Sequence, residues 1–161
     1  MTNQSPRQPK RTMKMVGQRP RVFTIESQTR LKLRASQIQR MVKSTQAQSN
    51  LAVCYYFEKD YAEAVRWWRK AAEQGHAQAQ NWLGFCHYYG QGVKKDYAEA
   101  VRWFSMSAEQ GYDKAQNWLG FCYYHGQGVE KDNEEAVRWF RKAAAQGHSG
   151  AKDYLNKLNA D

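Results

Sequence analysis

Few side chains in this sequence could act as a nucleophile, a general base or a metal ligand, and they are scattered. The cysteines are 32 and 36 residues apart with no Cys-x-x-Cys pair, and the histidines form no His-Glu-x-x-His motif, so no zinc site is expected. Cys86 and His87 are adjacent, but neighbouring residues of a helix point about 100° apart, which does not suit a nucleophile and its base. We expect a non-enzymatic protein with no catalytic residue, no metal and no cofactor.

The cysteines share one feature, because each occupies the same place in a repeated unit. Residues 77–112 align without gaps on residues 113–148, with identical residues at 24 of 36 positions. Residues 45–76 are the same unit, four residues shorter in the central loop, and a fourth copy begins at Ser149. The cysteines at the shared place are Cys54, Cys86 and Cys122. They are predicted to be buried thiols in a reducing compartment rather than a disulfide framework.

Each repeat is predicted to be a pair of helices. In the second copy, the first helix is expected to span residues 79–89, because apolar residues recur at three- and four-residue spacing. That face comprises Ala79, Leu83, Cys86 and His87. Gly84 stands in the middle of this helix, where glycine costs about 1 kcal/mol relative to alanine. We interpret Gly84 as the mark of a neighbouring helix that approaches too closely for a larger side chain.

The second helix of this copy is predicted to begin at Asp96. The carboxylate of Asp96 can accept hydrogen bonds from N–H groups of the first turn, and Glu99 completes a capping-box pattern. Glu99 and Arg102 are spaced to pair on the solvent side, and Gly111 is expected to end the helix in a left-handed conformation. The buried stripe is predicted to comprise Ala100, Trp103, Phe104 and Ser107, and the tryptophans assigned to the core are Trp67, Trp68, Trp103 and Trp139.

Stacked helix pairs of this kind form an α-solenoid, in which each repeat buries its apolar face against its neighbours. The expected fold is all-α, with about three and a half helix-turn-helix repeats behind a basic, largely disordered N-terminal arm. The predicted segments are a disordered arm at residues 1–27, a basic amphipathic cap helix at residues 28–44 and repeats at residues 45–161. The repeats divide into residues 45–76, 77–112, 113–148 and a partial cap at 149–161.

The first helices carry a second face that is aromatic where an ordinary surface helix would be charged. Rings offer contact area at little entropic cost, and the amides between them can bond a peptide backbone, so this face suits a peptide or a partner helix. The alternative is packing between neighbouring repeats, which would bury some of these rings without any ligand. The residues predicted to form the groove are Asn50, Tyr56, Asn81, Trp82, Phe85, Tyr89, Asn117, Trp118, Phe121 and His125.

The net charge of +10 is concentrated in the front of the chain. Residues 1–46 carry eleven Lys and Arg against one acid, Glu26, whereas residues 47–161 carry fourteen of each sign. This asymmetry is typical of an arm that contacts an anionic partner. The residues assigned to that role are Arg7, Lys10, Arg11, Lys14, Arg19, Arg21, Arg30, Lys32, Arg34 and Arg40.

The arm leaves several interpretations open. It could thread along RNA as part of a ribonucleoprotein while the solenoid docks on a neighbouring protein, or it could serve only as a solubilising tail. Its Arg-rich, acid-poor composition also fits a mitochondrial transit peptide, so the expected compartment is the cytoplasm, with the mitochondrial matrix as the alternative. No run approaches the roughly 18–20 apolar residues that a membrane span needs, and no secretory signal is evident.

The recurring motif resembles the Sel-one-like repeat family, relatives of the tetratricopeptide repeats with a longer internal loop. The resemblance covers residues 45–158 and rests on Ala79-x-x-x-Leu83-Gly84, Gly90-x-Gly92-Val93-x-x-Asp96, Ala100-x-x-Trp103 and the run from Ala108 to Gly111. The first copy lacks the glycine loop and is nearer to a plain tetratricopeptide unit. The resemblance also implies a tyrosine where His87 stands.

The resemblance implies a protein-interaction adaptor rather than a catalyst. In the tetratricopeptide relatives, the first helices line a concave groove that holds peptides. Cysteine-rich members of the family join adjacent helices by disulfides, but the matching places near Ala72 and Gln80 carry no cysteine here. The resemblance therefore does not place this chain in that extracellular subgroup, and it names no particular partner or oligomeric state.

Overall fold

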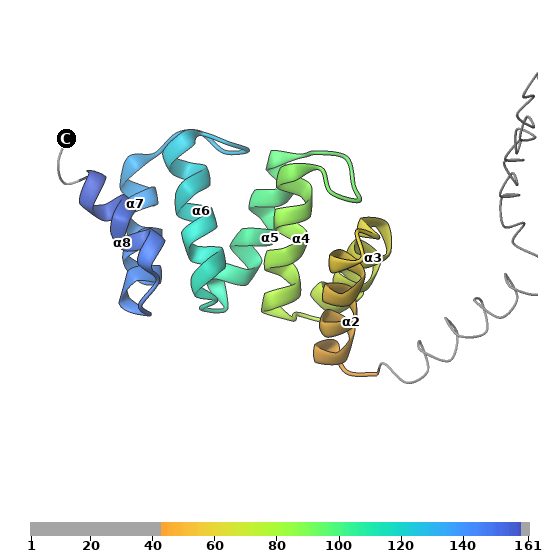
Figure 1. Cartoon of the computed structure of the whole chain (residues 1–161). Helices are drawn as coiled ribbons and strands as arrows, with labels where there is room; N and C mark the ends of the chain where they lie inside the picture. Colours follow the sequence, from red (N-terminus) through yellow and green to blue (C-terminus); the bar gives the residue numbers. More distant parts are fainter. Residues whose placement is uncertain (1–42, 159–161) are drawn as a thin grey trace, which may run out of the picture. The chain divides into compact units, whose positions relative to one another are not determined.

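The computed structural model describes residues 43–158, which form seven α-helices and, within that range, no strand (Figure 1). Successive helices form pairs, and each pair packs on the next in chain order. The all-α solenoid predicted from the repeats is confirmed. The helices are α2 (Thr45–Phe57), α3 (Tyr61–Ala72), α4 (Ala77–Tyr89), α5 (Tyr97–Glu109), α6 (Asp113–His125), α7 (Asn133–Ala145) and α8 (Ser149–Leu158).

An aspartate caps the start of the second helix of each pair, but only one of the two hydrogen bonds of the predicted capping box is made. The carboxylate of Asp96 accepts a hydrogen bond from the N–H of Glu99 at 3.0 Å, and the same bond recurs in the other two pairs. The reciprocal bond from Glu99 is not made. The N–H of Asp96 donates instead to the carbonyl of His87 at 2.9 Å, and Glu99 pairs with Arg102 at 3.3 Å, as their spacing predicts. The backbone bond ties the start of α5 to the end of α4.

Helix α4 begins two residues earlier than the apolar periodicity predicts. The ring Nδ1 of His76 accepts a hydrogen bond from the N–H of Ala79 at 3.2 Å, so His76 caps a helix that already includes Ala77. Histidine is not among the residues that usually cap helices, so the sequence pattern did not mark this start. After the second helices α3, α5 and α7, the residues Gly75, Gly111 and Gly147 adopt the predicted left-handed conformation, with φ of 86°, 88° and 94°.

The helices of one pair approach closely at the glycine in the middle of the first helix. A Cβ atom at Gly84 would lie 2.7 Å from the ring of Phe104, and one at Gly120 would lie 2.8 Å from the ring of Phe140. Both distances are too short for a side chain, which confirms the reason predicted for Gly84. In the first pair, Ala52 holds this place and is fully buried.

The long loops of the second and third repeats each contact the preceding repeat. Gly92 lies with φ of 71° directly against the backbone of Tyr61, at the start of α3, so that any Cβ at Gly92 would overlap the carbonyl of Tyr61. Gly128 makes the same contact with Tyr97 of α5. The loop therefore spaces successive second helices, and only glycine fits because the backbones touch.

Two of the three cysteines are buried as predicted, but the third is not. Cys86 and Cys122 have no exposed surface, and Cys122 packs in a cluster that includes Val101 of the preceding repeat. Cys54 is exposed, so the prediction of a buried thiol is wrong for the first repeat. Among the described residues, no earlier helix covers α2 in the way that α5 covers α6.

The predictions for the N-terminal arm lie outside the described residues. They include the disordered segment 1–27, its basic residues and all of the predicted cap helix 28–44 except Lys43 and Ser44. These two residues are not helical, and the Ser44 hydroxyl accepts a hydrogen bond from the N–H of Ala47 at 3.1 Å, which caps α2. None of the helices within residues 43–158 is long and apolar enough to cross a membrane.

Candidate functional site

A pocket with a volume of about 250 Å³ opens on the face formed by the first helices of three consecutive repeats. Helices α2, α4 and α6 all contribute to it, and we name it the first-helix pocket. Five of its residues belong to the predicted groove, and the other three do not. It is lined by Tyr56, Gln78, Asn81, Trp82, Phe85, Tyr112, Lys114 and Trp118.

The two tryptophans of the first-helix pocket also join the repeats. Trp82 stacks on Trp68 of α3, with ring centroids 5.1 Å apart and ring planes 4° apart. Trp118 stacks on Phe104 of α5 in the same way, at 5.5 Å and 4°. Packing between repeats, the alternative raised by the sequence, therefore occupies one side of each ring. Both tryptophans remain half-buried rather than buried, and both still line the pocket.

Other rings of the predicted groove surround these tryptophans. The ring centroid of Phe85 lies 5.7 Å from that of Trp82 and 5.9 Å from that of Trp118, edge-on to both. The ring of Tyr56 lies 5.5 Å from that of Trp82, and its hydroxyl proton is already donated to the side-chain oxygen of Gln91 at 3.0 Å. Phe121 is half-buried beside Trp118, outside the pocket lining.

The three asparagines of the predicted groove lie in different surroundings. Asn81 lines the pocket and is only 6% exposed, and its side-chain oxygen has no hydrogen-bond partner among the described residues. The side-chain oxygen of Asn117, one repeat further on, is likewise buried and unpartnered. Asn50 is exposed, and its oxygen accepts from Gln46 at 2.9 Å. The difference follows from register, because Ser49 rather than Asn50 aligns with Asn81.

The last two predicted groove residues lie at the exposed ends of the first helices. Tyr89 is 50% exposed, with its ring 4.5 Å from that of Phe85, and His125 is exposed with its ring 4.3 Å from that of Phe121. Phe57 aligns with both and is the more exposed ring at 78%, although it was not among the predicted groove residues. Alignment of the repeats was the signal that could have included it.

Three pocket residues were not among the predicted site residues, namely Gln78, Tyr112 and Lys114. Gln78 and Lys114 align with each other in successive repeats, whereas Tyr112 precedes α6 at the place that His76 occupies before α4. Lys114 is the only charged residue of the lining and forms no ion pair within residues 43–158. Burial raises the pKa of the Tyr112 hydroxyl, and the nearby Asp113 carboxylate adds to the rise, so this group stays neutral and able to donate.

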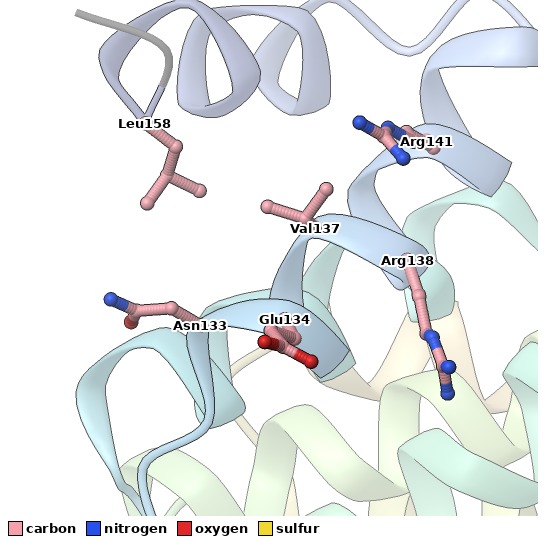
Figure 2. A pocket seen from close by; sticks show the side chains of 6 residues that line it. All are labelled: Asn133, Glu134, Val137, Arg138, Arg141 and Leu158. Atoms are coloured by element: carbon pink, nitrogen blue, oxygen red, sulfur yellow. The ribbon is translucent and has the colours of Figure 1, made fainter. Parts of the chain in front are cut away.

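A second hollow, of about 380 Å³, lies between α7 and α8 (Figure 2). Figure 2 shows Val137 of α7 and Leu158 of α8 facing it from opposite sides. Both residues are half-buried, whereas the aligned Val101 and Cys122 are 7% and 0% exposed because further helices cover them. This hollow is therefore the part of α7 and α8 that no further described helix covers. It has no ring and no buried unpartnered polar group among its lining residues.

His87 is a buried titratable side chain away from the first-helix pocket. It is 9% exposed, and tyrosines occupy the aligned places in the other repeats. Burial lowers its pKa, and the positive charge of Arg69 lowers it further, against the raising effect of Glu99 and Asp96. His87 is thus a neutral packing residue at physiological pH.

The thiols of Cys86 and Cys122 are buried packing groups as well. Burial raises the pKa of the Cys86 and Cys122 thiols to about 12, so neither supplies a thiolate at neutral pH. Within residues 43–158, no group of three or more His, Cys, Asp or Glu side chains is placed to hold a metal ion. What the described residues do bring together is a ring-lined pocket with an unpartnered amide and one free cation.

Comparisons with known proteins agree with this architecture. A family model described as the Sel1 repeat matches residues 45–76, 77–112 and 113–148. The structure of c5321, described as a protective antigen of uropathogenic Escherichia coli with an SLR fold, has 41% sequence identity and a TM-score of 0.69, over 71% of this chain and 25% of that chain. A Sel1 repeat protein from Oxalobacter formigenes has 33% identity and a TM-score of 0.63, over 66% of this chain and 44% of its own.

A third solved structure, cysteine-rich protein B of Helicobacter pylori, has 28% identity and a TM-score of 0.55, over 57% of this chain and 69% of that chain. The first two of these proteins are longer, and the present chain spans a quarter and less than half of their lengths. A search among curated proteins found no match. Three consecutive matches to one family model, on helix pairs that share its fold, show that this chain belongs to the Sel1 repeat family.

Proposed function

We propose that this protein is a non-enzymatic interaction scaffold that holds a segment of a partner protein on the face formed by its first helices. The observation that carries the proposal is the first-helix pocket, in which Trp82, Phe85 and Trp118 converge from two successive repeats. Rings that are already held in place by stacking lose little entropy when a partner covers them. The Sel1 repeat family, whose members are generally protein-interaction scaffolds, supports the same function.

The test must avoid residues that the fold needs. Because Trp82 and Trp118 stack on the core, their truncation would change folding as well as binding. Lys114 and Gln78 line the pocket without any hydrogen bond or ion pair among the described residues, so the double variant Lys114→Glu, Gln78→Arg is expected to fold normally. The matched control is Arg141→Glu, which reverses a charge at the second hollow.

Partners would be captured by crosslinking and mass spectrometry from the cells that make the protein. We expect the wild-type chain and Arg141→Glu to capture the same proteins, and Lys114→Glu, Gln78→Arg to lose them. If Arg141→Glu alone lost the captured proteins, the binding surface would be the second hollow rather than the first-helix pocket. Unchanged capture by both variants would reject the proposal.

We propose a second function for the basic arm, namely binding of RNA or another polyanion. The observation that favours it is the net charge of +10 within residues 1–46, beside a neutral remainder. Binding that neutralises about six to ten phosphates weakens by roughly 10³–10⁵-fold between 50 and 200 mM salt. We expect such a loss for RNA binding by the full chain, and a much smaller one for capture through the first-helix pocket. A variant with Arg7, Lys10, Arg11 and Lys14 changed to Gln should lose RNA only.

The compartment proposed for this function is the cytoplasm. All three cysteines are unpaired, as expected in a reducing environment. Localisation of the tagged full chain by microscopy and fractionation checks this, and recovery in the mitochondrial matrix with a shortened N-terminus would favour the alternative.

A further inference from the structure

Polar side chains that are buried or, at Asn117, half-buried fall into two aligned sets on the first helices. One set consists of glutamines, one in each repeat, and the other consists of the residues that directly follow them. The first set is Gln48, Gln80 and Gln116, and the second set is Ser49, Asn81 and Asn117. We name them the glutamine column and the asparagine column. They differ in whether the protein itself satisfies their hydrogen bonds.

The glutamine column is satisfied within the fold. The side-chain N–H of Gln80 donates to the carbonyl of Ala72 at 3.1 Å, and its oxygen accepts from Gln110 at 2.6 Å. Gln116 makes the equivalent pair of bonds, at 3.2 Å to the carbonyl of Ala108 and 2.8 Å from Gln146. These bonds link each first helix to the end of the preceding second helix and to its own partner helix.

The asparagine column is not satisfied within the fold. The side-chain oxygens of Asn81 and Asn117, and the hydroxyl of Ser49, are buried without a hydrogen-bond partner among the described residues. An unpaired buried polar group costs roughly 1–3 kcal/mol, and native proteins tolerate few of them. Ser49 is fully enclosed, but Asn81 lines the first-helix pocket. Rotation of its amide by 180° would break no internal bond and would present either its oxygen or its nitrogen to an occupant.

Given the proposed function, on which this inference rests, we propose that the occupant of the first-helix pocket is an extended stretch of polypeptide that bonds its backbone to Asn81 and places an acidic side chain against Lys114. An extended backbone has both free N–H and free C=O groups, so it can pair with whichever end of the Asn81 amide faces the pocket. The N–H groups of a helix are engaged internally beyond its first turn, so a docked helix would offer Asn81 no backbone N–H from its interior. The unpartnered amide therefore distinguishes an extended peptide from a partner helix.

The remaining lining of the pocket defines the side chains of this peptide. Lys114 is unpaired and is the only charge in the lining, so it favours a carboxylate over a cation. Trp82, Phe85 and Trp118 form an apolar wall that accepts an aliphatic or aromatic side chain. In an extended strand, alternate side chains point to opposite sides, so the apolar and acidic residues should be next-but-one neighbours.

The test starts from random peptides of about a dozen residues, displayed and selected on the full-length chain. We expect the selected peptides to share an apolar residue and an acidic residue two positions apart. Binding should fall about tenfold on Asn81→Leu, which removes the amide but preserves the bulk of the side chain. Lys114→Ala should weaken acidic peptides and leave their amide analogues unchanged, whereas Arg141→Glu serves as the control that changes neither.

Backbone recognition is tested on the peptide rather than on the protein, which keeps the proposal testable even if Asn81→Leu folds poorly. A selected peptide is remade with one N-methylated residue at a time. Methylation at one position should weaken binding to the wild-type chain about tenfold and have little further effect on Asn81→Leu, because the two changes remove the same hydrogen bond.

The outcomes separate this inference from the proposed function. If selected peptides depend on Phe85 and Lys114 but bind as helices, or if no N-methylated position is coupled to Asn81, the pocket is a binding site and the extended-backbone proposal is wrong. If no selected peptide depends on any residue of the pocket, the proposed function itself fails.

Discussion

The glutamine column and the asparagine column lie side by side on the same helices, but they serve different purposes. The side chain of Gln80 bonds to residues at the ends of two other helices, whereas the side chain of Asn81, the next residue, has no hydrogen bond within the described chain. A helix turns about 100° per residue, so this one step moves the side chain from the joint between repeats to the edge of the first-helix pocket. The comparison shows that burial of a polar side chain does not by itself identify a structural residue. What identifies it is whether the fold supplies partners.

The largest expected effect is loss of a glutamine bond. Gln80→Leu leaves the carbonyl of Ala72 and the side-chain amide of Gln110 each with one partner fewer, so the free energy of unfolding should fall by about 1–3 kcal/mol. Urea denaturation followed by circular dichroism measures this change. The matched control is Gln78→Leu, two residues earlier on α4, where no internal bond exists and no comparable loss is expected. Equal losses in the two variants would mean that the glutamine column does not join the repeats.

The opposite sign is expected for the asparagine column. Asn81→Leu replaces an unpaired buried amide by an apolar side chain of similar size, which should raise the free energy of unfolding by about 1 kcal/mol. The same variant should bind the selected peptides less well. Higher stability with weaker binding is the signature of a group kept for a ligand. A loss of stability would show that Asn81 has a structural role.

A pH-dependent effect is expected from His87, a third kind of buried polar residue. Its pKa in the folded state is lowered, chiefly by burial, so the folded chain favours the neutral ring. Stability from this group is present above the ordinary value of 6.5 and is lost as the pH falls towards the lowered pKa. His76, whose pKa burial also lowers, contributes in the same direction.

Thermal unfolding at a series of pH values from 7.5 to 5 measures this loss. His87→Tyr, which introduces the residue found at the aligned places Tyr55 and Tyr123, should reduce the loss, whereas His125→Tyr at an exposed site should not. A pH profile identical in wild type and His87→Tyr would contradict the interpretation.

The smallest effect is expected at Asn50. It is exposed and bonds only to Gln46 on the same helix, so Asn50→Ala should change stability by no more than about 0.5 kcal/mol. It should also leave peptide binding unchanged, because Asn50 does not line the first-helix pocket. Calorimetric titration of a selected peptide on Asn50→Ala and Asn81→Leu gives the direct contrast, and equal losses of affinity would remove the distinction between the two asparagines.

Much of the fold could be predicted because repetition makes each local signal visible several times. Gly84 predicted the close approach of another helix, which the structure shows to be that of Phe104 in α5, and Asp96 predicted the start of α5. Each signal reflects short-range sterics or hydrogen bonding. The predicted groove was less complete. Five of its residues line the pocket, but Asn50 lies elsewhere and Lys114 and Tyr112 were not included. Helical periodicity places residues on a face, but it does not say which neighbouring repeat will cover that face.

The sequence by itself determined that this chain is a stack of helix pairs, which helix faces are apolar, and where the second helix of each pair begins and ends. These features depend on backbone geometry and on the spacing of apolar residues, which are local properties. The tertiary structure decided which polar side chains find partners. Cys54 is exposed, whereas the aligned cysteines of the other two repeats are buried. The side-chain oxygen of Asn81 has no partner, although both the nitrogen and the oxygen of the neighbouring Gln80 side chain are hydrogen-bonded. Those outcomes depend on atoms brought from repeats some 30 residues away, as in the 30-residue separation of Gln80 and Gln110, and no local pattern contains them.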